Sequence, residues 1–210
     1  MGDYSLYAKA IIGMFAIMNP IGIVPIFLSM RGDRTVRECN AIARTTAISV
    51  AVIIIVSIWF GTYILDFFGI GIPAFRTGGG LLILLMAMAM LHAKQSHTRQ
   101  APEEADEANT KDSIGVVPLA MPLLAGPGAI SLAISNAHQA VDLTDKFVLS
   151  AGSVLIAFFV WLALRLATPI GKYLGTTGLN VATRIMGLLL AAIGIQMLAS
   201  GLVKLLPGLA

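Results

Sequence analysis

The sequence contains little charge for its length. Of its 210 residues, 57% are hydrophobic and only 12% are charged, and the mean hydropathy is +0.87. A soluble domain of this size carries roughly twice that charged fraction. The basic residues behind the net charge of +3 lie in short loops between apolar runs, so they do not indicate a nucleic-acid partner. Composition therefore predicts an all-α, multi-pass membrane protein surrounded by lipid.

Several chemistries lack the residues that they need. The single cysteine, Cys39, excludes an internal disulfide. The three histidines, His92, His97 and His138, do not have metal-ligand spacing, and no Ser–His or paired-Asp set supports hydrolysis. A Gly-rich loop followed by Lys-Ser/Thr is also missing, which argues against ATP as an energy source. We therefore expect no enzyme activity, no metal and no other cofactor.

Six apolar runs are long enough to cross a bilayer, which takes about 20 residues. They occupy residues 10–30, 45–65, 77–93, 113–141, 147–164 and 185–203. A polar stretch at 94–112 separates the first three from the last three, and we interpret it as a cytoplasmic connector. The chain is thus expected to be one transmembrane domain, 1–210, with a first three-helix repeat at 6–93 and a second at 113–205.

The two halves are weakly similar in sequence. An offset of 107 to 108 positions aligns Pro20 with Pro127 and Arg76 with Arg184. Because each half contains an odd number of spans, the halves must have opposite orientations, which makes an inverted 3+3 repeat. Ten Lys and Arg residues lie on the side of the odd-numbered loops and four on the other side. Positive loops stay inside, so both termini are predicted to lie outside, in the periplasm.

Two of the six runs are interrupted near their middles. The first run contains the stretch NPIG at residues 19–22, and the fourth contains AGPG at residues 125–128. Proline removes a backbone donor, and glycine weakens the helix further. Polar groups freed inside hydrocarbon are tolerated only where protein or a wet cavity surrounds them. We therefore predict discontinuous first and fourth helices that meet at the midplane.

The free backbone groups at these breaks suit a small zwitterion. The N–H groups at the start of the second half-helix favour a carboxylate, and the carbonyls at the end of the first favour an ammonium group or a small cation. The predicted substrate-binding residues are Asn19, Pro20, Gly22, Gly126, Pro127, Gly128 and Ser131. The alternatives are that the prolines only kink their helices, that Asn19 joins helices, and that Ser131 bonds back to its own helix.

Other residues have a structural and a functional interpretation. Arg76 and Arg184 start equivalent helices and are candidate gate or counter-ion residues, or they reach to the lipid headgroups. A stripe of small residues on the last helix favours close helix packing; it comprises Gly187, Ala191, Gly194 and Gly201. No Asp, Glu or Lys lies near the middle of a span, so a buried proton relay is not visible. A secondary transporter fits these observations, working by facilitated diffusion or by ion coupling through backbone carbonyls.

Four segments resemble the MarC family of membrane proteins. They are residues 18–25 (MNPIGIVP), 113–118 (SIGVVP), 122–130 (PLLAGPGAI) and 183–190 (TRIMGLLL), and the resemblance extends over essentially the whole chain. It implies a six-span protein of the bacterial or archaeal inner membrane. The family includes SnatA-type transporters of small neutral amino acids, which move glycine and alanine. The family's discontinuous first and fourth helices map onto the two breaks.

The expectation from the sequence is thus a secondary transporter of small neutral amino acids in the cytoplasmic membrane. Its substrate class comes mainly from the resemblance. The alternatives are a non-transporting membrane scaffold or envelope protein, and an exporter of other small molecules. A homo-oligomer, and coupling to sodium or to a proton, are compatible with the sequence.

Overall fold

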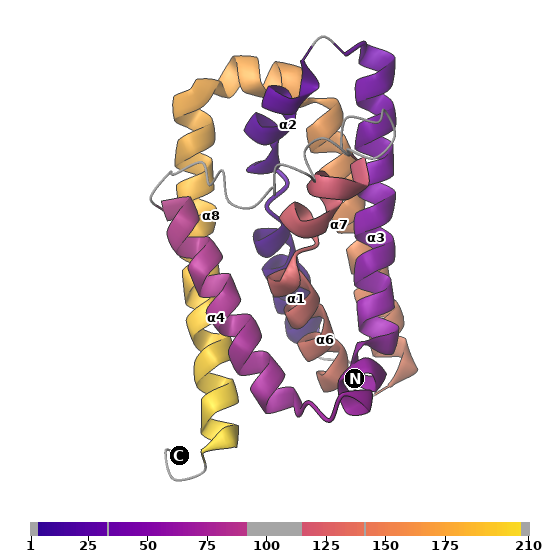
Figure 1. Ribbon diagram of the computed structural model, residues 1–210, viewed down its shortest axis with the longest axis vertical. Helices are drawn as coiled ribbons and strands as arrows, with labels where there is room; N and C mark the ends of the chain where they lie inside the picture. Colours follow the sequence, from indigo (N-terminus) through magenta and orange to yellow (C-terminus); the bar gives the residue numbers. More distant parts are fainter. Residues whose placement is uncertain (1–3, 33, 92–114, 141, 207–210) are drawn as a thin grey trace.

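The described part of the chain is helical throughout (Figure 1). The computed structural model describes residues 4–32, 34–91, 115–140 and 142–206. These residues form α1 (Tyr4–Met18), α2 (Ile23–Arg31), α3 (Val36–Phe67), α4 (Ile72–Leu91), η1 (Gly115–Leu124), α6 (Pro127–Gln139), α7 (Leu143–Arg165) and α8 (Ala167–Leu205). The expected all-α class is confirmed for them, and they contain no strand. The predicted connector at 94–112 lies outside the described residues.

Five stretches of the described chain are long and apolar enough to cross a membrane. They are Tyr7–Leu28, Val36–Phe67, Ile72–Leu91, Leu143–Arg165 and Thr177–Leu205. The fourth of the six predicted spans is present as η1 and α6, of 10 and 13 residues, and each is too short to cross alone. η1 is π-helical and ends with the N–H of Ala125 bonded to the Ala120 carbonyl at 2.8 Å. The architecture is that of a multi-pass membrane protein.

The second span begins earlier than its hydrophobicity indicates. α3 starts at Val36 because Thr35 and Glu38 form a capping box. The Thr35 hydroxyl accepts from the Glu38 N–H at 3.3 Å, and the Glu38 carboxylate accepts from the Thr35 N–H at 2.9 Å. The Thr35 and Glu38 N–H groups, which have no carbonyl partner within the helix, are thereby hydrogen-bonded. The helix therefore extends into the charged segment before residue 45.

The loop expected between the fifth and sixth spans is helical instead. α8 begins at Ala167, directly after α7, and continues through the expected loop. Its direction changes at Gly175, whose φ of 60° and ψ of −177° are accessible essentially to glycine alone. The bend is therefore made by Gly175 alone, and the residues on both sides of it are helical. The segment before the bend crosses the upper end of the molecule (Figure 1).

Helices at equivalent places in the two halves lie together. α3 packs on α7, and α4 packs on α8 along most of its length. Between these two pairs lie the interrupted helices, with α1 against α6 and α2 against η1 (Figure 1). The two interrupted helices run in opposite directions. The residues around both breaks, including Met18, Ile23, Leu124 and Ala129, belong to one buried apolar core.

Glycines bring α4 and α8 into backbone contact. A Cβ added to Gly194 would lie 2.9 Å from the Gly80 carbonyl oxygen, and one added to Gly201 would lie 2.8 Å from the Pro73 carbonyl oxygen. Gly187 is less tightly constrained, with the Ala87 carbonyl oxygen at 3.2 Å. These distances confirm that the small-residue stripe on the last helix packs against its neighbour. Each of the three glycines meets a different turn of α4.

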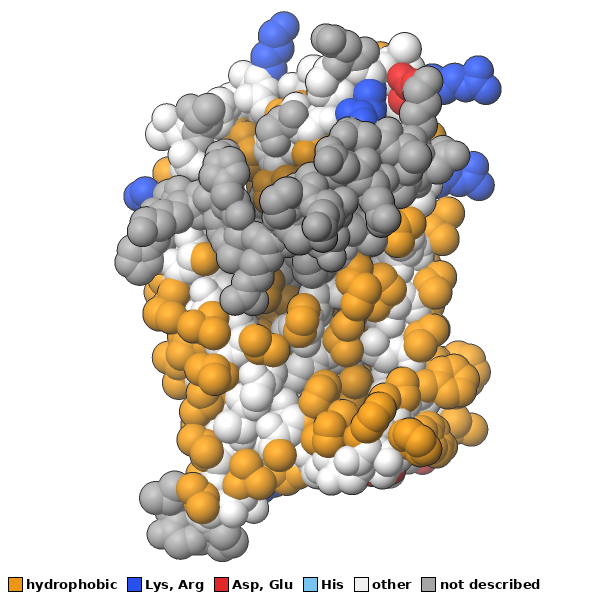
Figure 2. All heavy atoms as spheres, viewed as in Figure 1, with side chains coloured by type: hydrophobic (Ala, Val, Ile, Leu, Met, Phe, Trp, Pro, Cys, Tyr) orange, Lys and Arg blue, Asp and Glu red, His pale blue; other side chains and the backbone are white. Residues whose placement is uncertain are grey.

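The surface separates apolar flanks from a basic end. Large hydrophobic side chains are exposed along the helices, with Phe60 58%, Phe147 61% and Leu188 65% exposed. Figure 2 shows such side chains covering the flanks, while the Lys and Arg side chains visible on this face gather toward the end where α2 gives way to α3. Exposed apolar surface of this extent is suited to contact with lipid. Both chain termini lie toward the opposite end (Figure 1).

Candidate functional site

The first break is a turn capped by Asn19. α1 ends with the Asn19 N–H bonded to the Phe15 carbonyl at 3.0 Å. Asn19 then adopts a φ of 41°, in the left-handed region that asparagine tolerates better than most residues. Its Oδ1 accepts a hydrogen bond from the Gly22 N–H at 3.1 Å. A Cβ on Gly22 would lie 2.0 Å from Asn19 Nδ2, so glycine is needed to leave room for the capping side chain.

The second break leaves the start of α6 without a side-chain cap. Gly126 is extended, with φ −73° and ψ 177°, and Pro127 occupies the first turn, where its missing N–H costs nothing. Gly128 lies against α4, because a Cβ added to it would lie 2.8 Å from Ile83 Cγ1. Gly126 and Gly128 are buried, whereas Pro127 is exposed. The positive end of the α6 dipole is therefore located inside the helix bundle.

Ser131 lies in the contact between α6 and α4. Its side chain is 1% exposed, and its hydroxyl donates to the Phe75 carbonyl of α4 at 3.4 Å. A Cβ on Gly79 would lie 1.7 Å from Ser131 Oγ, so the two residues are in tight contact. The hydroxyl thus bonds to a neighbouring helix, an arrangement that neither sequence interpretation of Ser131 included.

A cavity of about 470 Å³ lies beside the breaks. Its walls come from most of α1, the early turns of α4 and α7, the later turns of α6 and the middle of α8, so it lies toward the end that carries both termini (Figure 1). The inner wall includes Ala16 and Leu132. Ala16 precedes Asn19 by three residues, and Leu132 follows Gly128 by four. The cavity therefore reaches to about one helical turn from each break.

The cavity wall is mainly apolar but contains a group of polar side chains. The polar residues in its wall are Tyr7, Lys9, Arg76, Asn136, Gln139, Asp145 and Gln196. Arg76 Nε and Asn136 Nδ2 are buried atoms without a hydrogen-bond partner. The Asp145 carboxylate accepts from the Tyr7 hydroxyl and from the Asp142 N–H at 3.2 Å. The same cavity thus contains buried donors and a carboxylate that is held in place.

Among the predicted site residues, only Arg76 lines this cavity. Asn19, Gly22 and Gly128 form and pack the breaks behind its inner wall, and Arg184 is exposed on α8. Sequence reasoning missed Asn136, Gln139 and Asp145, which lie near span ends where polar residues are ordinary, and Gln196, which lies well inside the last span. The available signal was the helical spacing of residues 132, 136 and 139, which places them on one face of α6. Within the described residues, no three His, Cys, Asp or Glu side chains gather as a metal site requires.

Comparison with known proteins identifies the family. Residues 4–206 match the family described as MarC family integral membrane protein. The chain belongs to the MarC family. UPF0056 membrane protein YhcE of Escherichia coli (strain K12) is 42% identical to it over 99% of this chain and 96% of that protein. UPF0056 membrane protein YvbG of Bacillus subtilis (strain 168) is 35% identical, over 97% of each chain.

The similarity extends to archaea. UPF0056 membrane protein MJ1677 of Methanocaldococcus jannaschii is 34% identical over 95% of this chain and 97% of that protein. No solved structure matches the chain. The names of these relatives specify membrane proteins and no substrate. Together with the apolar helices, the family establishes this MarC chain as an integral, multi-pass membrane protein.

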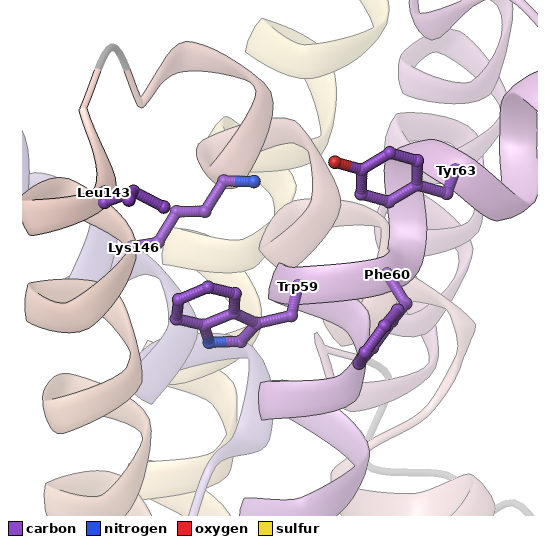
Figure 3. A pocket seen from close by; sticks show the side chains of 5 residues that line it. All are labelled: Trp59, Phe60, Tyr63, Leu143 and Lys146. Atoms are coloured by element: carbon purple, nitrogen blue, oxygen red, sulfur yellow. The ribbon is translucent and has the colours of Figure 1, made fainter.

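The MarC chain has a second recess, of about 430 Å³, between α3 and α7 (Figure 3). Lys146 Nζ lies 5.9 Å from the centroid of the Trp59 ring, and the Trp59 indole N–H donates to Ser150 Oγ at 3.1 Å. Figure 3 shows the Lys146 ammonium and the Tyr63 hydroxyl extending toward each other above that ring. Trp, Tyr and Lys in this arrangement are typical of a membrane–water interface. We interpret these three side chains as an anchor at the membrane surface.

Proposed function

We propose that this MarC protein is a secondary transporter of small neutral amino acids such as glycine and alanine, located in the cytoplasmic membrane. The observation that carries the proposal is the pair of broken, oppositely directed helices in the core, with a cavity that contains charged and polar side chains and ends about one turn from each break. Irregular backbone at membrane depth is tolerated where it lines a cavity, and in transporters it marks substrate sites.

The helix pairing supports an inverted repeat. An axis in the membrane plane relating residues 6–93 to 113–205 would bring together equivalent helices that lie close to it. The contacts of α3 with α7, of α4 with α8, and of the two broken helices with each other are compatible with such an axis. The basic residues at the α2–α3 end favour the cytoplasm for that end, which puts both termini and the cavity on the periplasmic side.

The geometry assigns different tasks to the two breaks. Asn19 occupies the Gly22 N–H, so the first break offers mainly carbonyl groups, which suit a cation or an ammonium group. The uncapped start of α6 offers backbone N–H groups at Gly128 and Ala129, which suit a carboxylate. A solute that moves inward from the cavity passes Ala16 and Leu132 and arrives between these groups. Transport then requires α2 and η1 to separate on the opposite side of the breaks, away from the cavity.

The size of the cavity supports a second candidate function, export of other small molecules. About 470 Å³ lies within the range of roughly 300–1,000 Å³ typical of sites for drug-sized ligands. The lining argues for the first candidate, because Arg76, Asp145 and Asn136 offer charge and hydrogen bonds that an apolar drug cannot use. A hydrophobic substrate would displace water from these polar side chains without forming hydrogen bonds to them in its place.

Counterflow in proteoliposomes tests the proposed function without knowledge of a coupling ion. Vesicles are loaded with unlabelled alanine, and the accumulation of external labelled glycine or alanine is followed. We expect transient accumulation that unlabelled glycine abolishes and that protein-free vesicles lack. If amino acids give no counterflow while a hydrophobic cation or dye is moved, the exporter function replaces this one. If no solute moves, the protein is a scaffold.

A further inference from the structure

We propose that Arg76 and Asn136 form the carboxylate-binding subsite of the periplasmic cavity. The inference deepens the proposed function and rests on it in one respect, because the carboxylate is taken to belong to the transported amino acid. It assigns recognition to two side chains in the cavity wall, in addition to the backbone groups of the breaks themselves.

The first argument is that both side chains have buried donors without acceptors. Arg76 Nε and Asn136 Nδ2 are each inaccessible to solvent and have no hydrogen-bond partner. Buried polar groups in folded proteins are nearly always paired, and an unpaired one destabilises the fold. Both residues line the same cavity, from two different helices, α4 and α6. To bond an acceptor in the cavity, each side chain must turn its buried donor toward the cavity.

The second argument concerns the chemistry of the acceptor. A guanidinium group is always charged, and its planar fork matches the two oxygens of a carboxylate. Lys9 adds a second positive charge to the cavity wall. A carboxylate therefore fits better than a neutral carbonyl group, since the apolar side chains around the cavity reduce the dielectric screening of the arginine charge.

The third argument is the negative charge elsewhere in the same wall. Asp145 is held by the Tyr7 hydroxyl and the Asp142 N–H, so its position is fixed by α1 and α7. The Asp145 carboxylate suits the ammonium group of a ligand, and the Arg76 guanidinium in the same cavity suits the ligand's carboxylate. A cavity with both signs favours a zwitterion over a simple anion. This chemistry selects amino acids by their shared main-chain groups and leaves side-chain selection to size.

Ligand-induced thermal shifts in detergent test the assignment, with alanine, alaninamide and propionate as probes. Alaninamide lacks the carboxylate and propionate lacks the ammonium group. We expect alanine to raise the melting temperature of the wild-type protein at much lower concentration than either analogue. Arg76→Gln and Asn136→Leu should each weaken alanine binding by about 30-fold or more, since one partner of a buried charged hydrogen bond is lost.

Two further variants serve as a conservative substitution and a control. Arg76→Lys retains the charge and should recover part of the affinity, which a merely structural role would not predict. Arg37→Gln removes an exposed arginine at the far end of the molecule and should bind alanine as the wild type does. Unchanged alanine affinity in both Arg76→Gln and Asn136→Leu overturns the inference, as does equal binding of alanine and alaninamide by the wild type.

Failure of this inference can be told apart from failure of the proposed function. Wild-type protein that binds alanine through Arg76 but gives no counterflow contradicts transport and leaves the subsite standing. Normal counterflow with an unchanged KM in the Arg76→Gln variant contradicts the subsite and leaves transport standing. If Arg76→Gln does not fold, the alanine affinity of Asn136→Leu decides between the two outcomes by itself.

Discussion

Gly80→Ala should separate α4 from α8 and lower the thermal stability of the protein. The new Cβ would lie 2.6 Å from the Leu198 backbone nitrogen and 2.7 Å from the Gly194 carbonyl oxygen. Non-bonded heavy atoms pack best at about 3.5–4.0 Å, so the helices must move apart by about 1 Å. Both obstacles are backbone atoms, and no side-chain rotation can relieve them.

The magnitude follows from the kind of clash. Overpacking a well-packed core typically costs about 1–3 kcal/mol. Alanine is a better helix former than glycine by about 0.8–1.0 kcal/mol, and this gain would conceal part of the loss. Gly78→Ala is the matched control, because Gly78 is exposed on the same helix and a Cβ there meets nothing within 4 Å. The difference between the two variants isolates the packing cost.

Thermal unfolding in detergent, followed by tryptophan fluorescence at one scan rate, measures that difference. For a chain of this length, a change of 1 kcal/mol corresponds to about 2–4 °C in Tm. Gly80→Ala should therefore unfold about 2–12 °C below Gly78→Ala. Gly194→Ala obstructs the same crossing from the other helix, and the double variant should cost less than the sum of the single ones. Equal melting temperatures for Gly78→Ala and Gly80→Ala would refute the close approach of the two helices.

Three further predictions concern the breaks and the cavity wall. Asn19→Ala loses a cap and forces alanine into a positive φ, so it should destabilise by about 1–3 kcal/mol, while Asn19→Gly should lose less; melting temperatures in detergent compare the two. Gly79→Ala should be destabilising because of its contact with Ser131, and Ser131→Gly in the same chain should restore part of the Tm, whereas no recovery would contradict the contact. Tyr7→Phe removes a hydrogen bond to the Asp145 carboxylate and should lower stability by about 1–2 kcal/mol. Adding Asp145→Asn to Tyr7→Phe should cost less than the sum of the two single substitutions, because both remove the same hydrogen bond.

The breaks were predictable because proline and glycine act locally. Proline lacks an N–H wherever it stands and glycine weakens a helix, so the combination of both at 19–22 and at 125–128 favoured an interruption there. The glycine stripe of α8 was predictable for a related reason, since small residues at helical spacing indicate a face that contacts another backbone. In both cases the property belongs to the residue type itself.

The cavity was not predictable in the same way. Asn136 and Gln139 lie near the end of a span, where a polar side chain ordinarily faces water or lipid headgroups. Whether they face a cavity depends on the positions of α1, α7 and α8, which come from distant parts of the sequence. The role of Asn19 was equally hidden, because its capping bond depends on a positive φ that the sequence does not specify.

The bend in α8 has a mechanical consequence. On one side of Gly175 a long helix is fixed to α4 by backbone contacts, and on the other a short helix lies against α2. The short arm is attached to α2 where Arg31 Nη1 donates to Thr168 Oγ1 at 2.6 Å and where Gly171 contacts Leu28. Because helices resist bending, rotation between the arms is concentrated in the two backbone torsions of Gly175. Gly175 therefore allows the α4/α8 pair to change its angle relative to the half-helix that follows the first break, while the short arm of α8 stays attached to that half-helix.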